Sequence, residues 1–332
     1  MSTTEVNKLG IIEIAKRTNN GAVIAVSEVL SRFDDVVMDM QWLPANQLAS
    51  HVHTRRLTLP TGTWRKMNIG ATPEASQTKQ IVENIGRLES WAQIDESVIN
   101  TLLGDKVAFR KTENDAFVMG LAQTLVTALV DGDTLANPER FDGLRIRTNA
   151  LTAATTYPPK VLGVGGSGGD TTSVFFIQWG PNTCHMIYQP DIGPAGGDSP
   201  IKTEDKGLET VVDSSGGLYS AYRSKFVISA GFAEHDDRAL TRLTNIEVTP
   251  SGVNIFEPDY AIALLNGMLN RGAGAYMYAH TSVLTQLDIM AMDKVNALYT
   301  TENLWGEPVT YFNRRTPVRQ LDAIGIAETV VS

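Results

Sequence analysis

Cysteine, long apolar runs and signal sequences are scarce or missing in this chain. Its 332 residues include one cysteine, Cys184. A single thiol cannot form an intramolecular disulfide or a zinc site built from several thiolates, so neither stabilises the fold. No apolar run approaches the ~20 residues of a membrane-spanning helix, and the N-terminal MSTTEVNKLG lacks the basic and apolar segments of a signal peptide. We therefore expect a soluble protein made in the cytoplasm, without a membrane partner.

The chain is also poor in positive charge. It carries 28 Lys and Arg residues against 37 Asp and Glu residues, a formal net charge of −9. Such a surface repels nucleic acid on average, because binding to phosphates needs clustered Lys and Arg. No acidic residue lies between Asp39 and Glu74. The basic residues of that segment are Arg55, Arg56, Arg65 and Lys66. This local basic segment predicts a partner, either DNA or another copy of the protein.

Residues 50–75 are expected to form a β-hairpin. Leu57 and Leu59 alternate with polar residues, Pro60-Thr61-Gly62 favours a turn, and Thr63–Asn68 is predicted to return as the second strand. A two-stranded hairpin is marginally stable by itself in water. We therefore expect this one to lie on another surface.

The clearest helical periodicity lies in residues 112–130. The apolar side chains that recur on one face are Val118, Leu121, Ala122, Leu125 and Leu129. Thr112 is the predicted N-cap, with Asp115 three residues later, and Asp131-Gly132-Asp133 is expected to end the helix. This helix would be the longest rigid element of the molecule.

The remaining patterns mix helices with strands and predict an α+β protein. Apolar residues make up 42% and charged residues 20% of the chain, which excludes a disordered or fibrous protein. The further elements expected are a short helix over 26–33, a strand from Ser76 leading into a helix over 96–103, two strands within 173–188, two strands within 218–247 interrupted near 235–237, helices over 259–271 and 281–294, and closing strands over 305–312 and 318–326.

A glycine motif formally matches a dinucleotide-binding fingerprint at Gly163, Gly165 and Gly168. That chemistry needs a helix N-terminus directly after the glycines, pointing at the pyrophosphate. The residues that follow, Asp170 to Ile177, have the β-branched and aromatic pattern of a strand. A surface loop is therefore predicted, and no cofactor is expected.

Two further pairs of residues are candidate sites of chemistry. Cys184 and His185 are adjacent, but neighbours on a strand point to opposite faces, so the thiol and the imidazole are not expected to form a catalytic dyad. His51 and His53 share one strand face and could form half of a metal site, but no third ligand is suggested nearby. The sequence thus predicts no catalytic, cofactor-binding or metal-binding residue, and no enzyme.

Four sequence blocks occur in one order along the chain. They are LPTGTWRKMNIGATPEASQTKQIVENIGRLESWAQID, VMGLAQTLVTALVDGDTLANPERFDGLRIR, TTSVFFIQWGPNTCHMIY and LYSAYRSKFVISAGFAEHDDRALTRLTNIEV. They resemble the signature blocks of tailed-bacteriophage major capsid proteins with the fold named after phage Hong Kong 97. The resemblance covers about Arg55 to Glu247, and GEPVTYFNRRTPVRQLDAI resembles the closing strands of the family.

The resemblance implies a Hong Kong 97-like fold of the α+β class, with peripheral and axial domains, an N-terminal arm and an extended loop. The strand connectivity stays open, since permuted connections would give the same sequence pattern. The implied division is an arm with a lead-in helix over 1–49, the extended loop over 50–75, the peripheral domain over 76–160 with its spine helix at 112–130, a mixed-sheet region shared by both domains over 161–250, and the axial domain with closing strands over 251–332.

The resemblance also implies a function and partners. Copies of the subunit would form the hexamers and pentamers of an icosahedral virion head, assembled in the host cytoplasm and enclosing double-stranded DNA without sequence-specific binding. Portal, scaffolding and decoration proteins would be further partners. No extension of scaffolding length precedes the hairpin, so we expect a separate scaffolding protein or none, and little N-terminal processing.

The basic hairpin is expected to dock on a neighbouring subunit. Its docking charges would be Arg55, Arg56, Arg65 and Lys66, with Trp64 as an apolar anchor. Two alternatives stay open: a bacterial compartment shell of the encapsulin kind, and a cytoplasmic hydrolase that uses Cys184 or the His51 and His53 pair.

Overall fold

The computed structural model describes residues 18–19, 22–23, 35–101, 106–153, 156–190, 200–250, 252–291, 299–304, 307–313 and 315–332. They fall into two compact units. The first contains Arg87–Leu125 and Ser199–Ser229, and the second contains Asp34–Gly86, Val126–Asp198 and Ala230–Ser332. The short helix expected over 26–33 lies outside the described residues.

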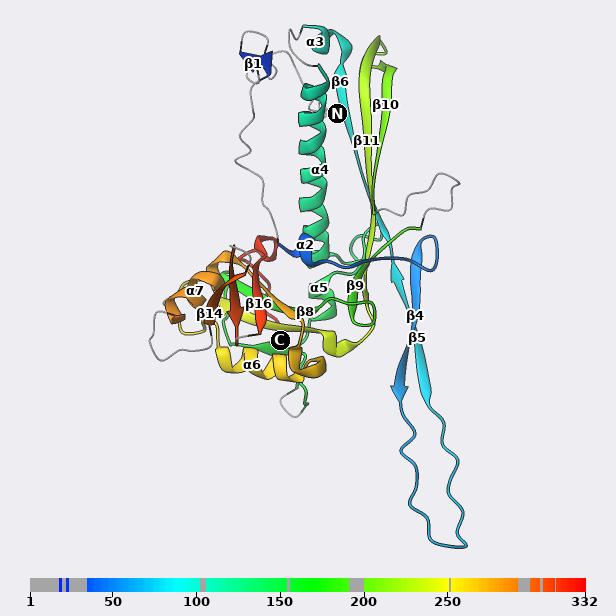
Figure 1. Cartoon of the computed structure of the whole chain (residues 1–332), viewed down its shortest axis with the longest axis vertical. Helices are drawn as coiled ribbons and strands as arrows, with labels where there is room; N and C mark the ends of the chain where they lie inside the picture. The colour runs from blue at the N-terminus through cyan, green and yellow to red at the C-terminus, as the bar shows by residue number, and fades with distance from the viewer. Residues whose placement is uncertain are drawn as a thin grey trace. The chain divides into compact units, whose positions relative to one another are not determined.

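The first unit is built from strands and the long helix (Figure 1). Its strands are β6 (Gly86–Asp95), β10 (Ile201–Val212) and β11 (Leu218–Glu234), where β10 pairs with β11 in antiparallel fashion and β6 also pairs with β11. β6 leads into α3 (Glu96–Asn100), as predicted, and Asp95 caps α3 by accepting a hydrogen bond from the Ser97 amide. The small core of this unit contains Ile94, Val98, Ile99 and Phe109.

The long helix α4 spans Lys106–Asp131, which confirms the predicted helix over 112–130 and begins it earlier. Its buried residues recur at helical spacing: Phe109, Leu121, Leu125, Val126, Leu129 and Val130. Thr112 is not the N-cap, and that prediction was wrong. Because it lies inside the helix, its hydroxyl donates to the carbonyl of Ala108 instead.

The core of the second unit is a seven-stranded mixed sheet covered by two helices. The strand order is β14 (Tyr299–Leu304), β15 (Glu307–Phe312), β16 (Thr316–Gln320), β13 (Ala275–Ala279), β8 (Thr171–Gln178), β12 (Leu240–Glu247) and β7 (Val161–Gly163). The apolar faces of α6 (Pro258–Gly267) and α7 (Thr281–Ala291) pack against it. Every residue of β8 is buried, so its apolar residues Val174–Ile177 follow one another without alternation, and the buried hydroxyls of Thr171, Thr172 and Ser173 are hydrogen-bonded.

A second group of strands in this unit involves β9 (Cys184–Tyr188). β9 pairs with β3 (Trp42–Pro44) and with the last residues of β11, Gly231–Glu234. The two strands expected within 173–188 are therefore confirmed as β8 and β9, but they belong to different sheets and do not pair as a hairpin. β11 and β12 are separated by the short helix η1 (Asp237–Ala239), at the interruption that the sequence predicts.

The hairpin at the base of the extended loop is formed by β4 (Ser50–Thr58) and β5 (Gln77–Asn84). The predicted return strand Thr63–Asn68 is wrong, because residues 59–76 form no strand. Pairing is instead made by β5, where Ile81 and Val82 face β4 positions as His53↔Ile81 and Val52↔Val82. The loop expected over 50–75 is therefore longer, because its second strand ends at Asn84. From here on, the extended loop means residues 50–84.

The other short elements complete the chain. They are β1 (Thr18–Asn19), β2 (Ala22–Val23), α2 (Val36–Asp39), α5 (Leu144–Arg147), η2 (Leu269–Gly272) and η3 (Asp322–Ile324). No described helix has the length and apolar character that crossing a membrane requires.

Candidate functional site

The end of the extended loop exposes apolar side chains to solvent. Residues 56–80 are all exposed, and Trp64 and Met67 have relative exposures of 103% and 93%. Glu74 orders the chain near the tip, because its Oε2 accepts hydrogen bonds from the amides of Thr61 and Gly62 at 2.8 and 3.1 Å. The loop therefore presents unburied apolar surface on a locally ordered backbone, which is typical of an interaction site.

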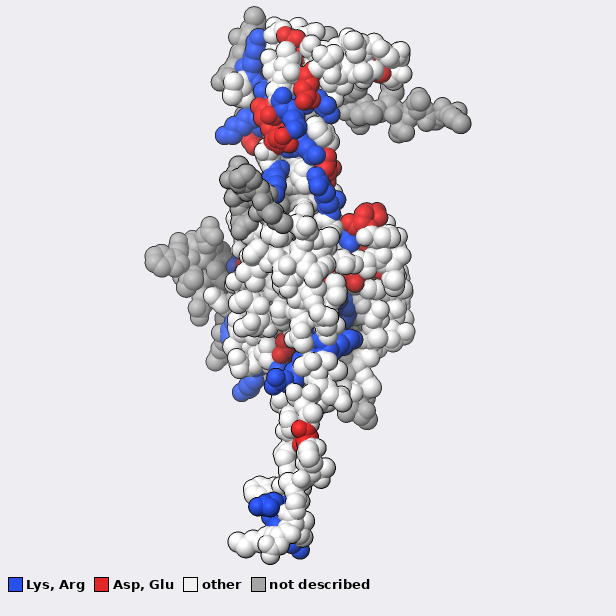
Figure 2. Space-filling model, turned by 90° about the vertical axis from the view of Figure 1, so that its right-hand side faces the viewer, with Lys and Arg blue, Asp and Glu red and all other residues white. Residues whose placement is uncertain are grey.

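The basic residues of the extended loop divide into two kinds. Arg56, Arg65 and Lys66 are exposed, and Figure 2 shows Lys and Arg atoms near the end of the loop. Arg55 is held within its own chain, because its guanidinium pairs with Asp237 and donates to the carbonyl of Glu234 at 2.6 Å. Its contact with a neighbouring subunit stays a prediction, but these intrachain partners give Arg55 a role in the fold.

The base of the extended loop is fixed to the second unit by a buried ion pair. Arg147 of α5 binds Glu83 of β5 with two hydrogen bonds, of 2.9 and 2.5 Å, and also donates to the carbonyl of Phe232. Burial alone would lower the pKa of Arg147, but the bonds to Glu83 outweigh it and raise that pKa. Gly231 permits the close approach of this segment, because a Cβ there would lie 2.5 Å from the carbonyl oxygen of Asn84.

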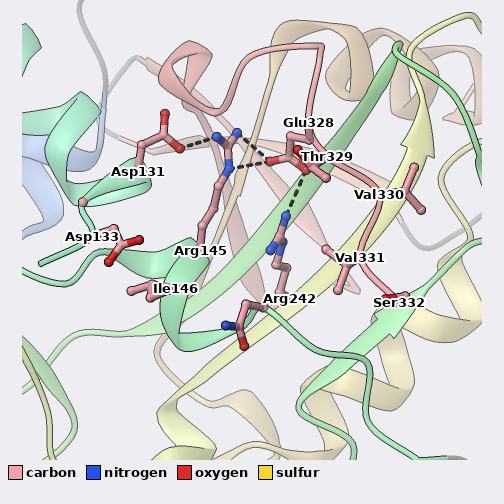
Figure 3. A pocket seen from close by; sticks show the side chains of 12 residues that line it. Asp131, Asp133, Arg145, Ile146, Arg242, Glu328, Thr329, Val330, Val331 and Ser332 are labelled. Atoms are coloured by element: carbon pink, nitrogen blue, oxygen red, sulfur yellow. Dashed lines mark hydrogen bonds and ion pairs between the residues drawn. The ribbon is translucent and has the colours of Figure 1, made fainter. Parts of the chain in front are cut away.

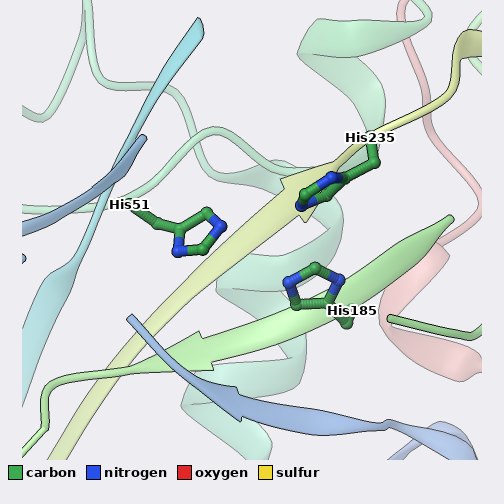
Figure 4. Close-up of side chains that lie close together, drawn as sticks. All are labelled: His51, His185 and His235. Atoms are coloured by element: carbon green, nitrogen blue, oxygen red, sulfur yellow. The ribbon is translucent and has the colours of Figure 1, made fainter. Parts of the chain in front are cut away.

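Histidines gather beside this base (Figure 4). His51 lies on β4, His185 on β9, and His235 directly after β11, and one ring nitrogen from each lies within 4.8 Å of the others. The ring of His53 stacks on that of His235, with centroids 4.2 Å apart. The sequence indicated the His51 and His53 pair but not its two partners, because they come from distant strands and only their tertiary placement brings them together.

The environment of these imidazoles disfavours their charged form. The pKa values of His185 and His235 are lowered to about 4, first by burial and then by the neighbouring histidines. The pKa values of His51 and His53 are lowered as well, again chiefly by burial, while the carboxylate of Glu83 opposes the effect. The lowered pKa values therefore favour the neutral form of all four rings at pH 7.

Cys184 has no character of a nucleophile. Its side chain is completely buried, and burial, reinforced by the charge of Glu234, raises the pKa of the thiol well above its ordinary value. A nucleophilic cysteine requires an accessible thiolate. The thiol therefore packs as a small apolar group, as expected from its place on a strand.

A pocket of about 360 Å³ in the second unit is lined by charged residues that satisfy one another (Figure 3). Arg145 binds both Asp131 and Glu328, and Arg242 pairs with Glu328 at 3.0 Å. The side chains of Arg242 and Glu328 are each 3% exposed. Because these charges are already paired, the network fastens the C-terminal segment to α5 and β12.

Comparison with known proteins gives a family. A family model described as major capsid protein GP7 matches residues 18–332. Two solved phage structures are also similar: bacteriophage Epsilon15, with 24% identity, coverage of 100% of this chain and 99% of that chain, and a TM-score of 0.74; and the bacteriophage JBD30 capsid, with 10% identity, coverage of 90% and 93%, and a TM-score of 0.52. No curated protein matches the chain in sequence.

These likenesses confirm the expected fold class, an α+β fold of the Hong Kong 97 kind. The exposed apolar loop and the absence of an accessible nucleophile at Cys184 agree with a structural role. The family match covers far more than half of the sequence. The chain therefore belongs to the major capsid protein GP7 family and is a structural coat protein of a phage virion.

Proposed function

We propose that copies of this subunit form the hexamers and pentamers of an icosahedral head, and that the extended loop of each copy lies on a neighbouring copy. The observation that carries the proposal is the exposure of Trp64 and Met67 at the end of a loop that the described residues of its own chain do not cover. The exposed charges Arg56, Arg65 and Lys66 suit a subunit whose net charge is −9.

The apolar anchor is expected to contribute more to docking than the charges. Burying a large side chain such as Trp64 stabilises a contact by about 2–3 kcal/mol. An exposed ion pair contributes about 0–1 kcal/mol. In a closed ring, later contacts also form at high effective concentration, so modest contacts suffice for a stable shell.

We also propose that the elements of this chain divide into a peripheral and an axial domain. The helix α4 would be the spine helix of the peripheral domain, and the region over 251–332, with α6, α7 and the closing strands, would supply the axial domain.

The shell would enclose double-stranded DNA, which a subunit with a net charge of −9 would not bind tightly. Portal, scaffolding and decoration proteins would be additional partners. A compartment shell of the encapsulin kind is disfavoured by the match to a phage capsid family.

Paired substitutions at one position test the loop contact. Trp64→Ala should leave the unassembled subunit folded but prevent shells, whereas Trp64→Phe, which keeps an aromatic anchor, should still assemble. Electron microscopy and sedimentation of the purified variants measure both outcomes. Normal shells from Trp64→Ala would refute docking through this residue, and enclosed enzyme in place of DNA would favour the compartment alternative.

A further inference from the structure

Histidine is scarce in this chain, yet most of its histidines meet at one place. Of the five in the sequence, His51, His53, His185 and His235 form one cluster in the second unit. The fifth, His280, is bonded elsewhere, with its Nδ1 3.0 Å from the hydroxyl of Ser282. Four of the five histidines, from three separate segments of the chain, therefore lie in one place, as the ligands of a common site would.

The ring nitrogens of the cluster lack well-formed hydrogen bonds. Both nitrogens of His185 and of His53, Nδ1 of His51 and Nε2 of His235 are buried without a hydrogen bond of good geometry to the described residues. Only backbone groups of Gly180 and Glu234 lie close enough to His185 and His53 to oppose the lowering of their pKa values. His185 is only 1% exposed. A buried polar atom without a partner is unfavourable, and several such atoms around a common space are the arrangement that a bound cation satisfies.

The chemistry of the donors points to a transition metal. Neutral imidazole is a ligand for zinc, copper and nickel, whereas calcium and magnesium prefer oxygen. The charged side chains whose fields reach the rings are Glu83, which favours a cation, and Arg55, which opposes one.

We propose that His51, His185 and His235 bind one Zn²⁺ ion, with water as the fourth ligand. Ligand nitrogens of tetrahedral zinc lie about 2.0–2.1 Å from the metal and therefore about 3.4 Å apart. The three nitrogens, now within 4.8 Å of one another, would close the remaining distance by rotation of the rings. In the part of the chain that the structure describes, these residues are the one group of metal-ligand side chains close enough to share an ion.

Such an ion would join three strands at the base of the extended loop. His51 belongs to β4 of that loop, His185 to β9, and His235 follows β11 directly. The metal would hold β4 against β9 and so fix the direction of the extended loop relative to β9. Its role would be structural and separate from the docking contact at Trp64.

The test is metal binding by the purified, metal-stripped full chain. Zn²⁺ is titrated into the protein, and the zinc that remains bound to it is measured. Co²⁺ is added in a separate experiment, because its visible absorption reports tetrahedral nitrogen ligands. Mg²⁺ serves as the control for a metal that prefers oxygen ligands. We expect one Zn²⁺ per chain, a Co²⁺ spectrum, no effect of Mg²⁺, and a higher unfolding temperature with Zn²⁺. His185→Asn and His51→Asn should weaken Zn²⁺ binding at least about 100-fold, and His280→Asn, the matched control, should not.

His51→Asn guards against misfolding of the fully buried variant, since His51 is only partly buried. Circular dichroism without metal checks that each variant is folded. Absence of stoichiometric Zn²⁺ binding to the folded wild-type chain would overturn the proposal. Equal binding by His51→Asn and His280→Asn would overturn it too, because the ion would then sit elsewhere.

Discussion

The guanidinium of Arg147 and the carboxylate of Glu83 form a bidentate ion pair, with Nη1 2.9 Å from Oε1 and Nη2 2.5 Å from Oε2, and both side chains are largely buried. The pair joins α5 to β5, so it fixes the base of the extended loop from within the subunit. A buried pair of this kind is strongly destabilising to break, because the remaining charge is left without its partner.

Glu83→Ala is expected to destabilise the unassembled subunit by about 3–5 kcal/mol. The loss arises because Arg147 stays buried with only more distant counter-charges, Glu234 at 3.8 Å and Asp142. Urea unfolding measures the change. Arg87→Ala, which removes an exposed pair with Glu89, is the control and should change the unfolding free energy by less than about 1 kcal/mol. Equal changes in unfolding free energy for the two variants would show that the buried pair contributes no more to stability than the exposed one.

Charge reversal should separate the two kinds of basic residue on the extended loop. Arg65→Glu with Lys66→Glu is expected to weaken or block assembly and to leave the unfolding free energy of the subunit unchanged within about 0.5 kcal/mol, since both side chains are exposed. Arg55→Glu should instead destabilise the subunit itself, because it places a carboxylate beside Asp237. Unfolding curves and light scattering during assembly distinguish the two. If Arg55→Glu were as stable as wild type, the intrachain role of Arg55 would be wrong.

The thiol of Cys184 should resist modification in the native subunit. Burial raises its pKa, so little thiolate is present at neutral pH and reagents cannot reach it. A colorimetric thiol reagent should therefore react with one equivalent per chain in urea and far more slowly without it. Rapid labelling of the folded protein would contradict this and would revive the hypothesis of a cysteine nucleophile.

Asp322 should make the second unit sensitive to acid. Burial by itself would raise its pKa, but hydrogen bonds from Thr281 and Gln320 outweigh burial and hold the pKa below 3.8. Because the folded-state pKa is the lower one, the unfolded chain binds the proton first. The stabilisation is thus present above pH 3.8 and is lost as the pH falls through the folded-state value.

A substitution isolates this contribution. Asp322 accepts from the amide and hydroxyl of Thr281 at the start of α7, so Asp322→Ala should cost about 1 kcal/mol at pH 7, as the loss of a helix cap does. As the pH falls through the folded-state pKa of Asp322, the variant and the wild type should converge in unfolding free energy. A constant difference between pH 7 and pH 2 would show that the charge of Asp322 is not involved.

Local patterns in the sequence predicted most of the elements. The apolar stripe of α4, the apolar run at 174–177 within β8 and the break at residues 235–237 depend on side chains that are neighbours along the chain, so these patterns can be recognised without the fold. The return strand of the hairpin is not determined by local pattern, since residues 63–68 and 77–84 could both pair with the first strand after a turn. Only the contact with β4 selects Gln77–Asn84, through pairs such as Val52↔Val82.

The sequence by itself determined the class of protein, because ordered blocks from Arg55 to Glu247 carry the resemblance to capsid subunits and the family match over residues 18–332 confirms it. Tertiary structure decided which side chains meet. It paired Arg55 with Asp237 and turned the His51 and His53 pair into a cluster by adding His185 and His235. The physical reason is that strand and helix periods act over a few residues, whereas contacts between sheets join residues far apart in the chain, and their pairing is fixed only when the whole core packs.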